Sequence, residues 1–160
     1  MNISDKGLSL IKSFEGFRTE AYQDSIGIWT IGYGTIRYPS GAAVRQFDEC
    51  SDEQAEEFLR HDVKTFVDGL NKRIGGIYLT QQQFDSLVSF CYNLGLAAFD
   101  SSTLFKKLKV NPNDETIYRY NHDEPAGSCE FTKWIRAGGK VVNGLLRRRM
   151  IEADFYNSKI

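Results

Sequence analysis

Residues 14–34 change within a few positions from a helical pattern to a strand-like one. Leu8 and Ile11 are spaced as on one face of a helix, and Glu15 falls four residues later on the same stripe. Gly16 allows that helix to end. The aromatic and β-branched residues that follow, interrupted by glycines, favour short strands. We therefore predict an α+β chain in which the first helix leads directly into a small antiparallel sheet.

A hairpin turn is predicted at Asp24-Ser25-Ile26-Gly27. An Asp side chain can bond its own backbone in a turn, and glycine adopts a positive φ without steric cost. This places Asp24 at the tip of the hairpin and Thr30 on the returning strand. Alternation along that strand puts Thr30 on one face with Ile28 and Gly32.

The three polar residues of this stretch also have ordinary structural interpretations. Glu15 could mark a fraying helix end that faces water and pairs with Lys12 or Arg18. Asp24 could be a turn former only, and Thr30 a generic strand residue. Spacing alone does not decide, because a Glu and an Asp nine residues apart occur in most proteins.

The rest of the chain is predicted to be mostly helical. Residues 51–54 have the S-x-x-Q spacing of a capping box and open a helix to about residue 71, which we expect to connect two lobes. Thr80 and Gln83 form a second such box, and Gly95 ends the helix that they open.

The last predicted helix, which Asn143 can cap, carries a charged residue on its inner side. Its inward apolar residues are expected to be Leu145, Ile151 and Phe155. Arg148 falls on the same side, whereas Arg147 and Arg149 diverge from it. An Arg held toward the interior needs a carboxylate partner, unless its stem packs and its guanidinium reaches solvent.

The composition is that of an ordinary folded protein, with 41% hydrophobic and 26% charged residues among 160. The formal net charge is -1, although the last 30 residues are basic. A basic end can attract an anionic polymer, and it is equally common as a solvated face. Because the overall charge is near zero and no recognition motif is present, nucleic acid is not an expected partner.

Three widely spaced cysteines, Cys50, Cys91 and Cys129, form no CxxC pair, and the chain has only two His. We therefore expect no metal site, and we expect Cys91 to be a buried thiol. No signal peptide and no membrane span are predicted, because no basic segment precedes an apolar run and no stretch reaches 18 apolar residues.

Acid-catalysed cleavage of a glycosidic bond requires two carboxyls in unlike environments. One carboxyl gives its proton to the leaving oxygen, and the other stays ionised and activates water or attacks carbon. Glu15 on an apolar stripe and Asp24 at an open turn meet this requirement, and Thr30 could orient the water. Activity that needs one protonated and one ionised carboxyl should be bell-shaped in pH.

Glu15, Asp24 and Thr30, with residues 29–34 around the threonine, resemble the active-site signature of the phage T4-type lysozymes, the family of muramidase endolysins (glycoside hydrolase family 24). Further motifs similar to the family follow in its order and extend the resemblance over nearly the whole chain: residues 79–95, 102–104, 131–140 and 144–149.

The resemblance implies a predominantly α-helical, two-lobed α+β lysozyme fold. The small antiparallel β element would lie in a lobe at about 12–60, followed by the connecting helix at about 51–71. A helical lobe would take about 72–160 together with the first helix. The implied activity is hydrolysis of the β-1,4 bond between N-acetylmuramic acid and N-acetylglucosamine in peptidoglycan, without a cofactor, by a monomer that lyses the host cell.

The site residues are carried over by position. The resemblance makes Glu15 the general acid, Asp24 the second carboxylate, acting through water in an inverting course, and Thr30 the water-positioning hydroxyl. The substrate-binding positions that it implies are Gly34, Ile36, Tyr92, Asn93 and Ser102. It also makes Arg148 a supporting residue, paired with Glu15 or a nearby acid.

Two departures from the family pattern stand out. Many members have His where this chain has Thr35, and residues 111–130 fit the family poorly and suggest no site. The N-terminus also lacks the apolar signal-anchor of some members. The chain is therefore expected to remain in the host cytoplasm until a holin permeabilises the membrane, and then to act on the wall in the periplasm.

Two other functions are alternatives to the hydrolase. A lytic transglycosylase cleaves the same bond with one carboxylic acid and leaves an anhydro product, so Asp24 and Thr30 would be superfluous. A non-catalytic wall-binding module could use the basic C-terminus, but it would have no need for Glu15, Asp24 and Thr30 together.

Overall fold

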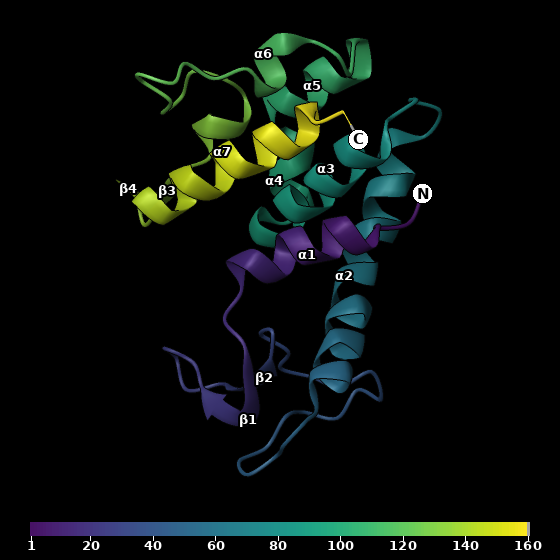
Figure 1. The fold of residues 1–160 in the computed structure, drawn as a ribbon, viewed down its shortest axis with the longest axis vertical. Helices are drawn as coiled ribbons and strands as arrows, with labels where there is room; N and C mark the ends of the chain where they lie inside the picture. The colour runs from purple at the N-terminus through teal and green to yellow at the C-terminus, as the bar shows by residue number, and fades with distance from the viewer. Residues whose placement is uncertain (160) are drawn as a thin grey trace. The chain divides into compact units, whose positions relative to one another are not determined.

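The computed structural model describes residues 1–159, and it is α+β and mainly helical, as predicted. In chain order, the elements are α1 (Asp5–Phe14), β1 (Arg18–Gln23), β2 (Trp29–Gly32), α2 (Asp52–Ile74), α3 (Gln81–Leu94), α4 (Leu96–Ser101), α5 (Thr103–Val110), α6 (Glu115–Tyr118), the 3₁₀ turn η1 (Phe131–Lys133), β3 (Arg136–Ala137), β4 (Lys140–Val141) and α7 (Asn143–Asn157) (Figure 1). No helix within residues 1–159 has the length and apolarity needed to cross a membrane.

The chain divides into two compact units. One unit is Leu8–Thr65 and contains the sheet of β1 and β2. The other combines Met1–Gly7 with the chain from Phe66 onward, and it contains the remaining helices and the small sheet of β3 and β4. Helices α1 and α2 contribute residues to both units.

In the first unit, β1 and β2 form the predicted antiparallel hairpin, with Tyr22 opposite Thr30. The backbone N–H of Gly27 donates to the carbonyl of Asp24 at 3.0 Å, and Gly27 has a φ of 85°. The turn therefore has the glycine conformation that the sequence predicts. The segment before α2 runs beside β1, where the Cys50 N–H donates to the Thr19 carbonyl at 2.8 Å.

Both predicted capping boxes are confirmed. At the start of α2, the Gln54 N–H donates to the Ser51 hydroxyl at 3.1 Å, and the Ser51 N–H donates to the Gln54 side chain at 2.9 Å. Thr80 and Gln83 make the same reciprocal pair at the start of α3. Each box satisfies two backbone donors that a helix end leaves without an intrahelical partner.

Helix α3 is the centre of the second unit, since every residue from Gln83 to Cys91 is buried. It packs against α7 (Figure 1). The ring of Phe90 makes edge-on contacts with two other aromatic rings, and its centroid lies 5.7 Å from that of Phe131 and 5.9 Å from that of Trp134. Cys91 is buried as predicted, and burial raises the pKa of its thiol to about 12, which makes it unreactive at neutral pH. All three cysteines are free thiols.

The inward face of α7 differs from the prediction. Its buried residues are Arg148, Arg149, Glu152, Ala153 and Tyr156. The residues expected to face inward, Leu145, Ile151 and Phe155, are only half-buried. Arg149, expected to diverge from the core, is fully buried. The physical reason is that an ion pair replaces apolar contacts on this face, so hydrophobic periodicity points to the wrong stripe.

The hairpin of β3 and β4 was not predicted. Gly138 and Gly139 both have positive φ and connect the two strands. Consecutive glycines of this kind favour the tight turn of a two-residue hairpin. Asn143 is the first residue of α7, and Val142 occupies the cap position in its place, without a side-chain cap.

Candidate active site

Glu15 lies one residue beyond the end of α1 and is half-buried. Its backbone N–H donates to the Lys12 carbonyl at 3.2 Å, so the helix tightens as it ends. Lys12 forms an ion pair with Glu56 and lies 5.4 Å from the centre of the Tyr33 ring. The Lys12 ammonium therefore pairs with Glu56 of α2. The ordinary interpretation of Glu15 had Lys12 or Arg18 as the partner of Glu15.

Asp24 lies at the tip of the hairpin, where the backbone holds one of its carboxylate oxygens. Oδ1 accepts the N–H of Ile26 at 3.0 Å and the N–H of Ile28 at 2.9 Å. Oδ2 accepts no hydrogen bond from any residue within 1–159. The turn thus fixes the carboxylate through one oxygen and leaves the other available.

Thr30 lies on β2, opposite Tyr22, with only 4% of its surface exposed. Its hydroxyl donates to the Ile28 carbonyl at 3.0 Å. Because a hydroxyl has one proton and two lone pairs, this bond leaves Oγ1 as an acceptor. Glu15, Asp24 and Thr30 all belong to the unit Leu8–Thr65.

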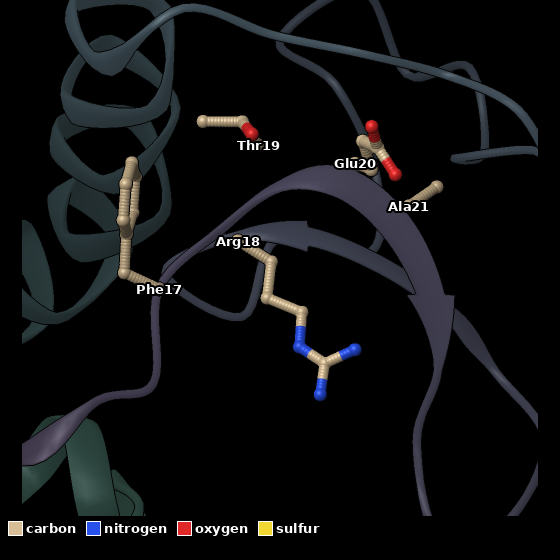
Figure 2. A pocket seen from close by; sticks show the side chains of 5 residues that line it. All are labelled: Phe17, Arg18, Thr19, Glu20 and Ala21. Atoms are coloured by element: carbon tan, nitrogen blue, oxygen red, sulfur yellow. The ribbon is translucent and has the colours of Figure 1, made fainter.

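A hollow of about 340 Å³ follows the strand that joins Glu15 to Asp24. Its lining residues are Phe17, Arg18, Thr19, Glu20 and Ala21. Figure 2 shows the Arg18 guanidinium on the opposite side of the strand from the side chains of Phe17 and Thr19. A volume in this range suits a small ligand or one segment of a polymer. A second hollow of about 330 Å³ includes Trp29 and Phe47, of which Phe47 is 87% exposed and has a φ of 72°.

The turn after β2 holds two of the predicted binding positions. Gly34 is exposed with a φ of 98°, and Ile36 is 45% exposed. Between them, Thr35 is buried, and its hydroxyl donates to Asp62 Oδ2 of α2 at 2.7 Å. Burial raises the pKa of Asp62, and the bond from Thr35 opposes this rise.

The other predicted binding residues lie in the second unit. Tyr92 is half-buried, with its ring edge-on to Phe66 at 5.4 Å, and Asn93 is exposed near the end of α3. Ser102, also predicted to bind substrate, is buried and has a structural role. It is 1% exposed, its hydroxyl accepts the Phe105 N–H at 3.0 Å, and it is the N-cap of α5. Because the cap occupies this buried hydroxyl, we leave Ser102 out of the proposed substrate contacts.

Arg148 is buried, and its carboxylate partner in α7 is Glu152. Arg148 Nε donates to Glu152 Oε1 at 3.1 Å, and Nη2 donates to the Ser89 carbonyl of α3 at 3.2 Å. Arg149 Nη1 lies 3.1 Å from Glu152 Oε2. Burial raises the pKa of the Glu152 carboxyl, and the two guanidiniums oppose this rise.

Three structural features, two in the unit Leu8–Thr65 and one in the other unit, were not foreseen from the sequence. They are the bond from Thr35 to Asp62, the exposed Phe47 beside β1, and the bond from Arg149 to Asn93. No local sequence pattern predicts these features, because each one joins residues that are far apart in the chain or depends on a single backbone angle. Among residues 1–159, no group of His, Cys, Asp and Glu could hold a metal ion.

Comparison with known proteins assigns the family. Residues 12–152 match the family described as Phage lysozyme. The chain is 45% identical over 158 residues to the endolysin of Bacillus phage B103, covering 98% of this chain and 54% of that protein. It is also 41% identical to the endolysin of Acyrthosiphon pisum secondary endosymbiont phage 1, covering 99% of each.

The solved structure of the endolysin from Escherichia coli O157:H7 phage FAHEc1 is similar throughout, with a TM-score of 0.81 and 40% identity over 100% of this chain and 96% of that one. The chain spans about half the length of the Bacillus phage relatives. Its match to the family covers most of its residues, and the chain therefore belongs to the phage lysozyme family.

Proposed function

We propose that this chain is a muramidase that hydrolyses the β-1,4 bond between N-acetylmuramic acid and N-acetylglucosamine in peptidoglycan. In this proposal, Glu15 is the general acid, Asp24 is the second carboxylate and Thr30 positions the attacking water. Membership in the phage lysozyme family supports the reaction class and the substrate class.

The observation that carries the proposal is the division of hydrogen bonds at Asp24 and Thr30. The backbone occupies Asp24 Oδ1 and the hydroxyl proton of Thr30, while Asp24 Oδ2 and Thr30 Oγ1 remain acceptors. A water molecule that donates one hydrogen to each acceptor would direct a lone pair of its oxygen away from both. A fixed lone pair aimed at the anomeric carbon is what an inverting hydrolysis requires.

The bond-breaking step then needs an acid on the other side of the sugar. Glu15 would give its proton to the glycosidic oxygen as the bond to the anomeric carbon breaks. The water that attacks that carbon would lose a proton to Asp24. The hollow along residues 17–21 lies on the strand between these two carboxyls and would hold part of the glycan. Gly34 and Ile36, on the turn after β2, and Tyr92 and Asn93, on α3, are the remaining proposed contacts.

The test is lysis of chloroform-treated Gram-negative cells, followed as loss of turbidity. Glu15→Gln keeps the shape of the side chain and removes its acidity, so activity should fall by about 100-fold or more. Glu57→Gln, an equal change on the exposed surface of α2, is the matched control and should keep wild-type activity. Equal lysis by wild type and Glu15→Gln would reject the assignment.

Product mass separates the hydrolase from a lytic transglycosylase. Hydrolysis adds one water and leaves a reducing end, whereas a transglycosylase leaves a 1,6-anhydromuramoyl end. Mass spectrometry of digested peptidoglycan should find only the hydrated product. An anhydro product would overturn the role given to Asp24 and Thr30.

The proposed route to the substrate depends on a second protein. We propose that the chain stays in the host cytoplasm until a holin permeabilises the membrane and then acts on the wall in the periplasm. Expression without a holin should leave cells intact until chloroform is added. Lysis before chloroform would contradict the dependence on a holin.

A further inference from the structure

Asn93 and Arg149 are joined by a side-chain hydrogen bond between α3 and α7. Arg149 Nη2 donates to Asn93 Oδ1. A guanidinium has only donors, so the atom that meets it must be the amide oxygen and not the amide nitrogen. The bond therefore fixes which end of the Asn93 amide faces Arg149. Its nitrogen keeps both hydrogens for another partner, and none of residues 1–159 accepts them.

Arg149 is positioned for this bond by burial, by the Phe90 ring and by an ion pair with Glu152. Its side chain is fully buried, and its guanidinium carbon lies 5.2 Å from the centre of the Phe90 ring. Nη1 lies 3.1 Å from Glu152 Oε2, while Glu152 Oε1 accepts the Ser89 hydroxyl at 2.7 Å. Burial lowers the pKa of Arg149 to about 10, so the guanidinium is still charged at neutral pH.

Asn93 itself is exposed, in contrast to the buried groups behind it. We infer that Asn93 presents its amide N–H groups to an amide carbonyl oxygen of the peptidoglycan strand, and that Arg149 is the positioning residue that keeps this donor outward. The inference rests on the proposed function and deepens it by assigning a direction to one substrate hydrogen bond. The charge on Arg149 also polarises the Asn93 amide, which makes its N–H groups better donors.

Amide carbonyls occur in two parts of peptidoglycan. The N-acetyl groups of both sugars carry them, and so do the stem peptides. Both are hydrogen-bond acceptors without a donor on the oxygen, which matches a side chain that offers only N–H groups at this surface. Glycan strands freed of their peptides by an amidase retain the first source and lose the second.

The central variant is Asn93→Asp, which replaces the outward donor with an acceptor and still gives Arg149 an oxygen to bond. The fold should therefore be preserved or slightly stabilised, while KM for peptide-free glycan strands should rise about tenfold with a smaller change in kcat. Arg149→Lys, whose shorter ammonium side chain lacks the planar fork, should raise KM in the same direction. Asn157→Asp, an equal change on the exposed end of α7, is the control and should leave both constants unchanged.

A second readout does not depend on turnover. In the Glu15→Gln background, the side-chain amide signals of Asn93 in a ¹⁵N–¹H NMR spectrum should shift when peptide-free glycan is added. These signals are identified by their loss in Asn93→Asp. A KM effect on peptide-free strands assigns the N-acetyl carbonyl, and an effect only on peptide-bearing strands assigns the stem.

An unchanged KM on both substrates, together with unshifted Asn93 signals, would overturn the inference. In that case, hydrolysis by the wild type would still support the proposed function. If the wild type releases no reducing ends but the Asn93 signals shift, the proposed function fails and the binding contact survives.

Discussion

The hydroxyl of Thr35 donates a hydrogen bond of 2.7 Å to Asp62 Oδ2 and thereby ties the turn after β2 to α2. The donor is a neutral hydroxyl, and its carboxylate acceptor lies 27 residues further along the chain. Asp62 is half-buried, and burial raises the pKa of its carboxyl above the usual 3.8.

Thr35→Val should lower the free energy of unfolding by about 1–3 kcal/mol at pH 7, because it leaves a half-buried carboxylate without its donor. Since the pKa of Asp62 is raised in the folded state, its ionisation costs stability as pH rises through that value. Thr35→Val should enlarge this cost, so its effect should be smaller near pH 3, where Asp62 is protonated. Urea unfolding at both pH values measures the difference. Thr35→Ser, which keeps the hydroxyl, should stay near wild type, and an equal loss at both pH values would contradict the account.

Gly7 of α1 packs against Asp85 of α3 without room for a side chain. A Cβ at Gly7 would lie 2.5 Å from Asp85 Cγ. The carboxylate cannot easily move aside, because Oδ1 accepts the Ser4 N–H at 3.1 Å and the Gln81 side chain at 2.8 Å. Gly7→Ala should therefore destabilise the protein by about 1–3 kcal/mol.

The matched control for Gly7→Ala is Gly144→Ala in the first turn of α7. A Cβ at Gly144 would meet nothing within 4 Å, so this change should stabilise the helix by about 0.5–1 kcal/mol. Thermal unfolding of both variants gives the comparison. If the unfolding temperatures of both variants shifted in the same direction, close packing at Gly7 would not explain the effect of Gly7→Ala.

Glu130, in the second unit, forms ion pairs with two lysines. Its Oε1 lies 2.6 Å from Lys107 Nζ and 2.9 Å from Lys133 Nζ. Burial by itself would raise its pKa, but the hydrogen bonds from the two lysines outweigh burial and hold the pKa below 4.5. A lowered pKa in the folded state contributes stability above pH 4.5, which is lost as pH falls through the native value.

Glu130→Gln should accordingly destabilise the protein at pH 7 by about 1–3 kcal/mol. The difference from wild type should shrink steadily below pH 4.5 and reach its minimum once Glu130 is protonated. Unfolding by urea between pH 7 and pH 2.5 follows this convergence. A constant difference across the range would mean that the two ion pairs do not set the acid stability.

The cluster of Arg148, Arg149 and Glu152 has two guanidiniums and one fully buried carboxylate. Glu152→Gln would remove the buried negative charge that pairs with both guanidiniums, so we expect a loss of about 3–5 kcal/mol. Arg147→Gln changes a neighbouring exposed residue and should stay within about 0.5 kcal/mol of wild type. Chemical denaturation of the two variants tests this. A small effect of Glu152→Gln would mean that water compensates the guanidiniums.

The sequence by itself determined the local elements and the order of the candidate residues. The hairpin at Asp24 and Gly27 follows from turn chemistry, and the starts of α2 and α3 follow from their capping boxes. Such features depend on residues within four positions of each other, so a single chain segment contains the whole cause. The candidate roles of the polar residues came instead from the resemblance to a family.

Only the tertiary structure decided the contacts between distant segments. Arg149 was predicted to diverge from the core and is fully buried, because Glu152 and Phe90 provide a partner and a surface for its guanidinium. Ser102 was expected to bind substrate and is a buried helix cap. Glu15 continues the stripe of α1 in the sequence, yet the backbone leaves the helix just before it. Desolvation and pairing depend on what packs against a side chain, and hydrophobic periodicity does not specify that partner.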